Sequence, residues 1–167
     1  MKPGMDAYDA TAWTDLFVAA AGASAALAGL VFVAVSINIE RILALPGVPN
    51  RALQTLLQLL AVVVFSLLLL TPGQTNTALG IELLALSVPL VIASLVLVAR
   101  ALRVGDSSPM VDVRLAAVVI ATVPFVVAGV SLIVEAGGGI YWVLGGAVAA
   151  IVVGVLNAWV LLVEILR

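Results

Sequence analysis

The chain has 167 residues, of which 65% are hydrophobic and only 10% are charged, and its formal net charge is −2 at pH 7. Soluble domains carry about 45–50% apolar and about 25% charged residues, so this balance excludes a water-soluble fold and makes the lipid bilayer the expected surroundings. A net charge this small, without a clustered basic surface, excludes nucleic acid as a partner.

The residue types needed for most enzyme chemistry are missing. The sequence contains no histidine and no cysteine, which removes the usual general base, thiolate nucleophiles and the commonest metal ligands. The single lysine, Lys2, lies in the N-terminal tail and cannot activate a serine inside the membrane. We therefore expect a protein that is not an enzyme and that holds neither a metal ion nor a cofactor.

The first apolar segment covers residues 15–39. The flank that precedes it carries Asp6 and Asp9 against one basic residue, Lys2. A cleaved signal peptide has a basic flank and a shorter apolar core. We therefore expect this segment to be retained as the first transmembrane helix.

Turn-forming and charged residues separate the later apolar segments. A Pro72-Gly73 pair ends the second segment, the one substantial loop covers residues 100–114, and Gly137–Gly139 form a tight turn before the last segment. Because a helical span needs about 20 apolar residues, five spans account for most of the chain. We predict one all-α transmembrane domain, a five-helix bundle, with spans at 15–39, 51–70, 79–99, 115–134 and 140–163.

The arginines predict how the spans are threaded, because cytoplasmic flanks of membrane spans hold most of the Lys and Arg residues. With the N-terminus outside and the C-terminus in the cytoplasm, Lys2 is the only basic residue on the outer side. A four-span or a six-span arrangement would scatter the arginines over both faces. The arginines expected on the cytoplasmic side are Arg41, Arg51, Arg100, Arg103, Arg114 and Arg167.

Two spans carry small residues four positions apart, a spacing that lets another backbone approach closely in a membrane. We interpret the two stripes as helix-packing surfaces. The spans run in the same direction, so their stripes can meet inside one chain, as Gly29 and Gly154 suggest, or can serve an oligomer or another membrane protein. The stripes consist of Ala21, Gly22, Ala25 and Gly29 in the first span and Gly146, Ala150 and Gly154 in the fifth.

Polar side chains gather at the depth of the inner leaflet. Gln54 and Gln58 are four residues apart in the second span and project from one side of that helix. Such groups are either an interhelical hydrogen-bond clamp or the lining of a cytoplasmic vestibule or lipid-headgroup pocket, with Arg41 and Arg51 at its rim. The cluster consists of Ser36, Asn38, Gln54, Gln58 and Asn157.

Glu82 is the one acidic residue well inside an expected span, about a turn from its outer end. Carboxylates inside membranes are candidate ion or proton sites. Because Glu82 can reach the outer interface, a solvated flank is the favoured interpretation.

Two prolines near mid-membrane predict helix kinks, Pro89 in the third span and Pro124 in the fourth. The segments around them are similar in sequence and run in opposite directions, which resembles the inverted repeats of some transporters. Chance similarity is favoured, because the repeat is only seven residues long.

The first third of the chain resembles small bacterial multi-span inner-membrane proteins of unsettled function. The likeness is carried by Trp13, by Asp15–Phe17, by the stretch from Gly22 to Asn38 and by Arg41–Leu43, and it covers about residues 13–53. It implies a multi-pass protein of the inner (plasma) membrane, and it carries over no functional residues.

Two functions fit these observations. The favoured one is a non-enzymatic accessory or scaffold protein that acts through helix–helix association, as a homo-oligomer or with another membrane protein. The alternative is a small oligomeric channel or transporter with a polar vestibule on the cytoplasmic side. A continuous polar path would favour the alternative, and the sequence places amides on one side of the membrane only.

Overall fold

The structure is a computed structural model of the chain and describes the backbone of residues 6–45, 47–103 and 110–166, with the side chains of residues 7–45, 47–100 and 115–159. Within these ranges the chain is helical apart from turns and short connections, and it contains no strand. In this described part of the chain, five helices are long and apolar enough to cross a membrane, as the sequence predicts. The elements are η1 (Asp6–Tyr8), η2 (Ala10–Trp13), α1 (Thr14–Ile37), α2 (Ile39–Ala44), α3 (Val48–Leu69), α4 (Asn76–Arg103), α5 (Met110–Val134) and α6 (Ile140–Leu166).

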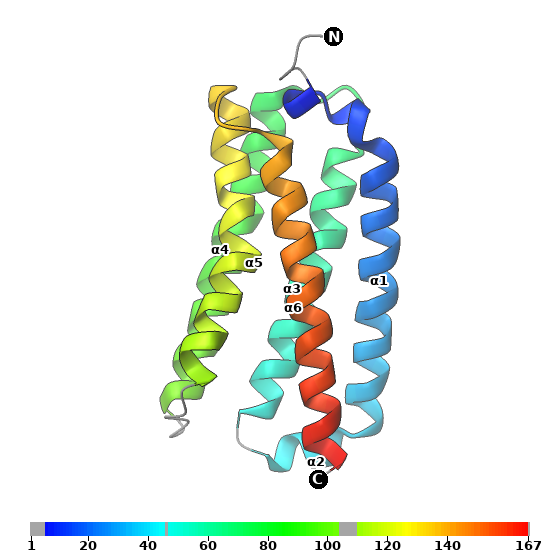
Figure 1. Ribbon diagram of the computed structural model, residues 1–167, viewed down its shortest axis with the longest axis vertical. Coiled ribbons are helices and arrows are strands. Elements are labelled where there is room, and N and C mark those ends of the chain that lie inside the picture. The colour runs from blue at the N-terminus through cyan, green and yellow to red at the C-terminus, as the bar shows by residue number, and fades with distance from the viewer. Residues whose placement is uncertain (1–5, 46, 104–109, 167) are drawn as a thin grey trace.

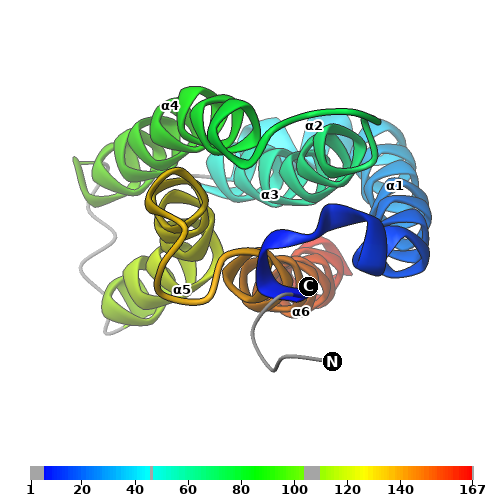
Figure 2. The same cartoon turned by 90° about the horizontal axis from the view of Figure 1, so that it is seen from above.

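The five long helices run up and down the bundle in two layers. Seen from above, α4, α3 and α1 form one layer and α5 and α6 form the other (Figure 2). The short helices η1 and η2 lie at one end of the bundle, called here the η1 end, and α2 lies at the other, called the α2 end (Figure 1). The helix α1 therefore stands at one edge of the bundle, where it packs chiefly against α3.

Local sequence explains where several helices begin and end. Gly47 adopts a left-handed φ of 80° directly before α3, and a proline occupies the first turn of that helix, where its missing N–H costs nothing. Gly73, with φ 75°, turns the chain between α3 and α4. Pro89 and Pro124 lie inside the continuous helices α4 and α5.

The connection between the first two spans differs from the sequence prediction, which left residues 40–50 as a loop. Ile39–Ala44 form the short helix α2. Ile42 is buried against Val48 and Ala52 of the following helix, and this contact fixes α2 against the bundle end. The segment is too short to show helical periodicity in the sequence. The centre of the predicted 100–114 loop, residues 104–109, lies outside the described residues.

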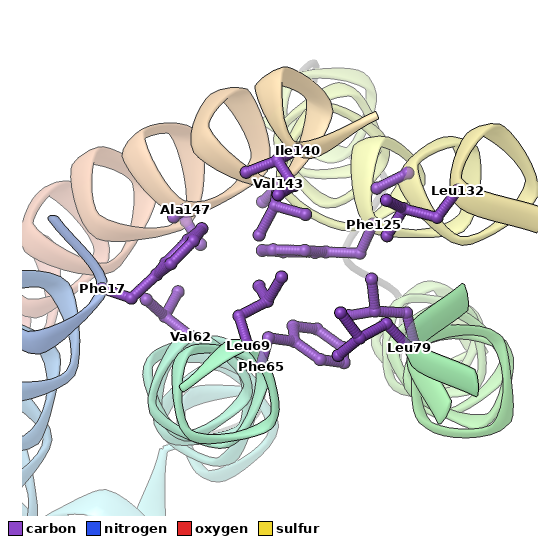
Figure 3. Close-up of a cluster of buried hydrophobic side chains, with 14 residues drawn as sticks. Phe17, Val62, Phe65, Leu69, Leu79, Phe125, Leu132, Ile140, Val143 and Ala147 are labelled. Carbon is purple, nitrogen blue, oxygen red and sulfur yellow. The ribbon is translucent and has the colours of Figure 1, made fainter. Parts of the chain in front are cut away.

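The main apolar core fills the half of the bundle nearest the η1 end. Its side chains come from all five long helices and point toward one another in Figure 3. The rings of Phe65 and Phe125 lie at its centre, 4.4 Å apart between centroids. The side chain of Phe17 attaches α1 to this core, where it lies beside Val62 and Ala147 (Figure 3).

The helices α4 and α5 come into backbone contact at a pair of glycines. A Cβ atom placed on Gly80 would lie 2.6 Å from the backbone oxygen of Gly129. A Cβ atom on Gly129 would lie 2.7 Å from Cγ of Leu84. The contact depends on the absence of side chains at both positions, and the sequence analysis did not single out either glycine.

Candidate functional site

The small-residue stripe of α6 faces the interior of the bundle. A Cβ atom on Gly146 would lie 3.0 Å from the ring of Phe125, and one on Gly154 would lie 2.9 Å from Cδ2 of Leu59. Ala150, between the two glycines, is 1% exposed. This stripe is an internal packing surface, and the side chains that cover it come from α3 and α5.

The small-residue stripe of α1 faces away from the bundle. In the described part of the chain, nothing lies within 4 Å of a Cβ atom placed on Gly22 or on Gly29. Ala25 is exposed as well, whereas Ser24 and Ala28 on the other side of the helix are buried. We call the surface formed by Gly22, Ala25, Ala26 and Gly29 the open α1 face.

The prediction that α1 and α6 meet inside one chain through Gly29 and Gly154 is wrong. Gly154 packs on Leu59 of α3, and Gly29 has open space beside it. Ala21 is the half-buried member of the predicted stripe and lies at its edge. Small-residue spacing marks a surface suited to close approach but does not specify which helix fills it.

A polar cavity lies at the α2 end between α3, α4, α5 and α6. Its volume is about 20 Å³, which is room for about one water molecule. Arg51 and Gln54 are 7% and 8% exposed and are polar members of its lining. Its lining consists of Gly47, Asn50, Arg51, Gln54, Leu97, Val98, Ala117, Val153 and Asn157.

Two buried polar side chains lie one helical turn deeper than this lining. Gln58 follows Gln54 on the same face of α3, and Ser94 precedes Val98 on the same face of α4. They are 1% and 0% exposed, and among the described residues neither amide atom of Gln58 nor Oγ of Ser94 has a hydrogen-bond partner. Leaving such a group unsatisfied costs about 1–3 kcal/mol.

The predicted polar cluster is therefore divided. Gln54 and Asn157 line one cavity, and Gln58 lies just beyond it. Ser36 and Asn38 do not line the cavity, and each bonds its own helix: Ser36 Oγ donates to the carbonyl oxygen of Phe32 at 2.8 Å and Asn38 Nδ2 to that of Ala34 at 2.9 Å. An interhelical clamp that includes Gln58 is also wrong, because its amide bonds no described group.

The two arginines predicted at the rim also differ from each other. Arg51 is buried in the lining of the cavity, whereas Arg41 on α2 is exposed and does not line it. Sequence reasoning did not single out Ser94 for this region. A serine in an apolar span is a weak signal, because its hydroxyl can usually bond a carbonyl of its own helix.

Glu82 lies toward the opposite end of the bundle, where it is half-buried and accepts a hydrogen bond from Gln74 Nε2 at 3.1 Å. A second carboxylate at this end, Glu135, accepts a bond from Asn76 Nδ2 at 3.1 Å. The described residues contain no group of three or more acidic, histidine or cysteine side chains that could hold a metal ion. Glu82 is thus bonded to the turn that precedes α4.

No protein-family model, curated protein or solved structure matches this chain. The open α1 face and the polar cavity are the two surfaces from which a function can be inferred.

Proposed function

We propose that the protein is a non-enzymatic membrane accessory or scaffold protein that acts through helix–helix association. The open α1 face is its association surface, and a second copy of the chain is its partner. The observation that carries this proposal is that Gly22 and Gly29 look onto open space, while Gly146 and Gly154 are covered within the chain.

Glycine and alanine give lipid little surface to contact. Helices in membranes gain stability instead where small residues let two backbones approach, because close packing replaces the hydrophobic effect as the driving force. On the open α1 face, no helix of the described chain provides this close packing, so a second helix that packs there would add stability. The position of α1 at an edge of the bundle leaves room for a second backbone (Figure 2).

The open α1 face is suited to pairing with itself. In a dimer with its two-fold axis along the membrane normal, both copies of α1 run in the same direction and present the same surface. Gly22 and Gly29 are seven residues apart, which is about two helical turns. Both glycines of one copy can therefore contact the partner helix along a single stripe.

Disulfide cross-linking tests this proposal, because the natural chain has no cysteine. We expect Ala25→Cys to form a covalent dimer under mild oxidation in native membranes. Ile92→Cys is the control, because Ile92 is 57% exposed on α4, away from the open α1 face. Equal cross-linking of both variants, or none at Ala25→Cys, would contradict the proposal.

We also propose that the protein lies in a bacterial inner membrane with the orientation that the arginines predict. The η1 end is then outside the cell membrane, and the α2 end faces the cytoplasm. Thr75 and Glu40 are exposed at the two ends. Thr75→Cys should react with an impermeant thiol reagent in intact cells, and Glu40→Cys only after lysis. Labelling of Glu40→Cys in intact cells would show that the α2 end faces outward and would contradict the proposed orientation.

The second candidate function, an oligomeric channel or transporter, is supported by the polar cavity at the α2 end. The Phe65–Phe125 core fills the other half of the bundle, so one copy offers no continuous polar route. We expect purified protein in liposomes to show no ion or proton flux above empty vesicles. A flux that Glu82→Gln abolishes would favour the channel over the scaffold.

A further inference from the structure

The short helix α2 lies across the end of the bundle instead of continuing the direction of α1. It bridges the end of α1 and the start of α3 (Figure 1). The chain bends at Asn38, whose φ of −109° and ψ of 19° are not those of an α-helix. The amide Nδ2 of Asn38 donates to the carbonyl oxygen of Ala34 at 2.9 Å, which satisfies one of the last carbonyls of α1. Because the long helices cross the membrane, α2 runs closer to the membrane plane than to its normal.

The helix α2 lies at the depth where hydrocarbon gives way to water. The 24 residues of α1 rise about 36 Å at about 1.5 Å per residue, slightly more than the about 30 Å of hydrocarbon that a span must cross. Ile37, the last residue of α1, is 77% exposed, and the charged residue Glu40 is exposed three residues later. An apolar and a charged side chain, both exposed and this close in sequence, are typical of the membrane interface.

One side of α2 packs on the bundle, and a second side is apolar but uncovered. Ile42 is 1% exposed and contacts Val48 at the start of α3. Ile39 and Leu43 are four residues apart and therefore lie on one side of the helix. They are 44% and 68% exposed. We call the pair formed by Ile39 and Leu43 the α2 ridge.

A third side of α2 is suited to water. Glu40 and Ala44 are also four residues apart, and both are exposed. Each follows a residue of the α2 ridge, so this side lies about 100° around the helix from the ridge. A helix with separate apolar and charged sides is expected to lie in an interface, with the apolar side in the acyl chains and the charged side in water.

We propose that α2 is an interfacial helix that inserts the α2 ridge into the phospholipid leaflet at this end of the bundle, while Glu40 and Ala44 stay in water. The partner is the lipid surface itself, at the level just below the headgroups. Lipid is favoured over a protein as the occupant because the ridge begins two residues after Ile37. The exposed apolar surface of a membrane-spanning helix thus continues directly into the ridge.

Fluorescence quenching at single cysteines tests this proposal, because the chain has no cysteine of its own. A bimane label is attached at Ile39→Cys or Leu43→Cys on the α2 ridge, and at Glu40→Cys or Ala44→Cys as matched controls with the same spacing. The protein is held as one copy per nanodisc, so that lipid is the available partner. The quenchers are a phospholipid with a nitroxide near its headgroup and aqueous iodide.

We expect the lipid nitroxide to quench the label on the α2 ridge at least about threefold more strongly than at the two control positions, and iodide to give the reverse order. Val88→Cys reports depth, because Val88 is 43% exposed in the middle of the span Asn76–Arg100. A nitroxide near the end of the acyl chain should quench at Val88→Cys more strongly than on the ridge.

Two results would overturn the proposal. Equal quenching on the α2 ridge and at the controls, with both quenchers, would show that α2 has no lipid-facing side. Protection of the ridge from both quenchers would show that protein, rather than lipid, covers it. The side chains of the ridge are not part of the buried cluster around Ile42, so labelling leaves that contact in place.

The α2 ridge and the open α1 face can fail separately. Quenching in nanodiscs that hold one copy reports the position of α2, whereas covalent dimers of Ala25→Cys report the association. The proposal also holds for either orientation of the chain, because both leaflets offer acyl chains below their headgroups.

Discussion

The helices α1 and α6 carry the same kind of small-residue stripe and use it in opposite ways. On α6 the rings and methyl groups of Phe125 and Leu59 fill the space beside the glycines, and on α1 that space is open. Small-residue spacing therefore indicates how closely a partner helix can approach. The tertiary structure decides whether that partner helix belongs to the same chain. Substitutions at glycines can therefore separate folding of the bundle from association of bundles.

The largest loss of stability is expected when a side chain is added to a glycine that contacts the backbone of another helix. A side chain can rotate away from the added atoms, whereas backbone cannot. Gly80→Val should destabilise the bundle by more than about 3 kcal/mol through overpacking against Gly129. Thermal unfolding in detergent measures the loss. Gly145→Val is the matched control, because nothing lies within 4 Å of a Cβ atom on Gly145. Similar Tm values for the two variants would show that the α4–α5 contact is loose.

A smaller loss is expected on α6, because the group that obstructs Gly154 is a flexible leucine side chain. Gly154→Leu should destabilise the bundle by about 1–3 kcal/mol as Leu59 is displaced. The same thermal unfolding experiment measures it. An unchanged Tm would mean that α6 packs on α3 with space to spare, contrary to the 2.9 Å approach of its Cβ position.

Gly29→Leu should give the opposite result, with almost no effect on unfolding of the single bundle. Its side chain would enter open space on the outward face of α1. In a dimer, however, the same side chain would hold the two backbones apart, so cross-linking through Ala25→Cys should fall several-fold. A large loss of Tm without a loss of cross-linking would place Gly29 in the core rather than at an interface.

The smallest effect is expected at the segment that leads into α1. Asp9 accepts hydrogen bonds from the hydroxyl and the backbone N–H of Thr11, and these bonds lower the pKa of its carboxyl below the usual 3.8. Because the folded pKa is depressed, this contribution is present above pH 3.8 and is lost as the pH falls through the folded value. Protection of the Thr11 amide from exchange, relative to its intrinsic rate, should fall in that range, and in Asp9→Ala it should already be low above pH 3.8. Exchange in Asp9→Ala that matches the parent chain would contradict the cap.

The number and approximate bounds of the spans could be predicted from sequence because hydropathy reports directly where water is excluded. The prediction for the second span, 51–70, compares with an observed α3 of Val48–Leu69. Which face of a span meets protein could not be predicted in the same way. Lipid and core are both apolar, so helical periodicity no longer separates inside from outside.

The polar cavity was partly predictable for a related reason. Gln54, Gln58 and Asn157 are rare residue types in a span, and because they are expected at the same depth, the sequence predicted that they cluster. Ser94 belongs to the same region but resembles the other serines of the apolar spans in sequence. Only the structure shows that Ser94 is 0% exposed and that its hydroxyl lacks a hydrogen-bond partner among the described residues.

The turn between α5 and α6 is joined to the N-terminal segment at the η1 end of the bundle. The Gly138 N–H donates to Tyr8 Oη at 3.0 Å, and Gly139 lies against the carbonyl of Ala7 so closely that no Cβ atom would fit.

This contact sets an order for biosynthesis. Tyr8 leaves the ribosome 130 residues before its partner, which at an elongation rate of about 5–20 residues per second is a wait of roughly 10 s. Until the last hairpin is inserted, the leading segment has no docking place. A chain truncated before Gly138 should therefore have an N-terminal segment that proteases cleave more readily than that of the 167-residue chain.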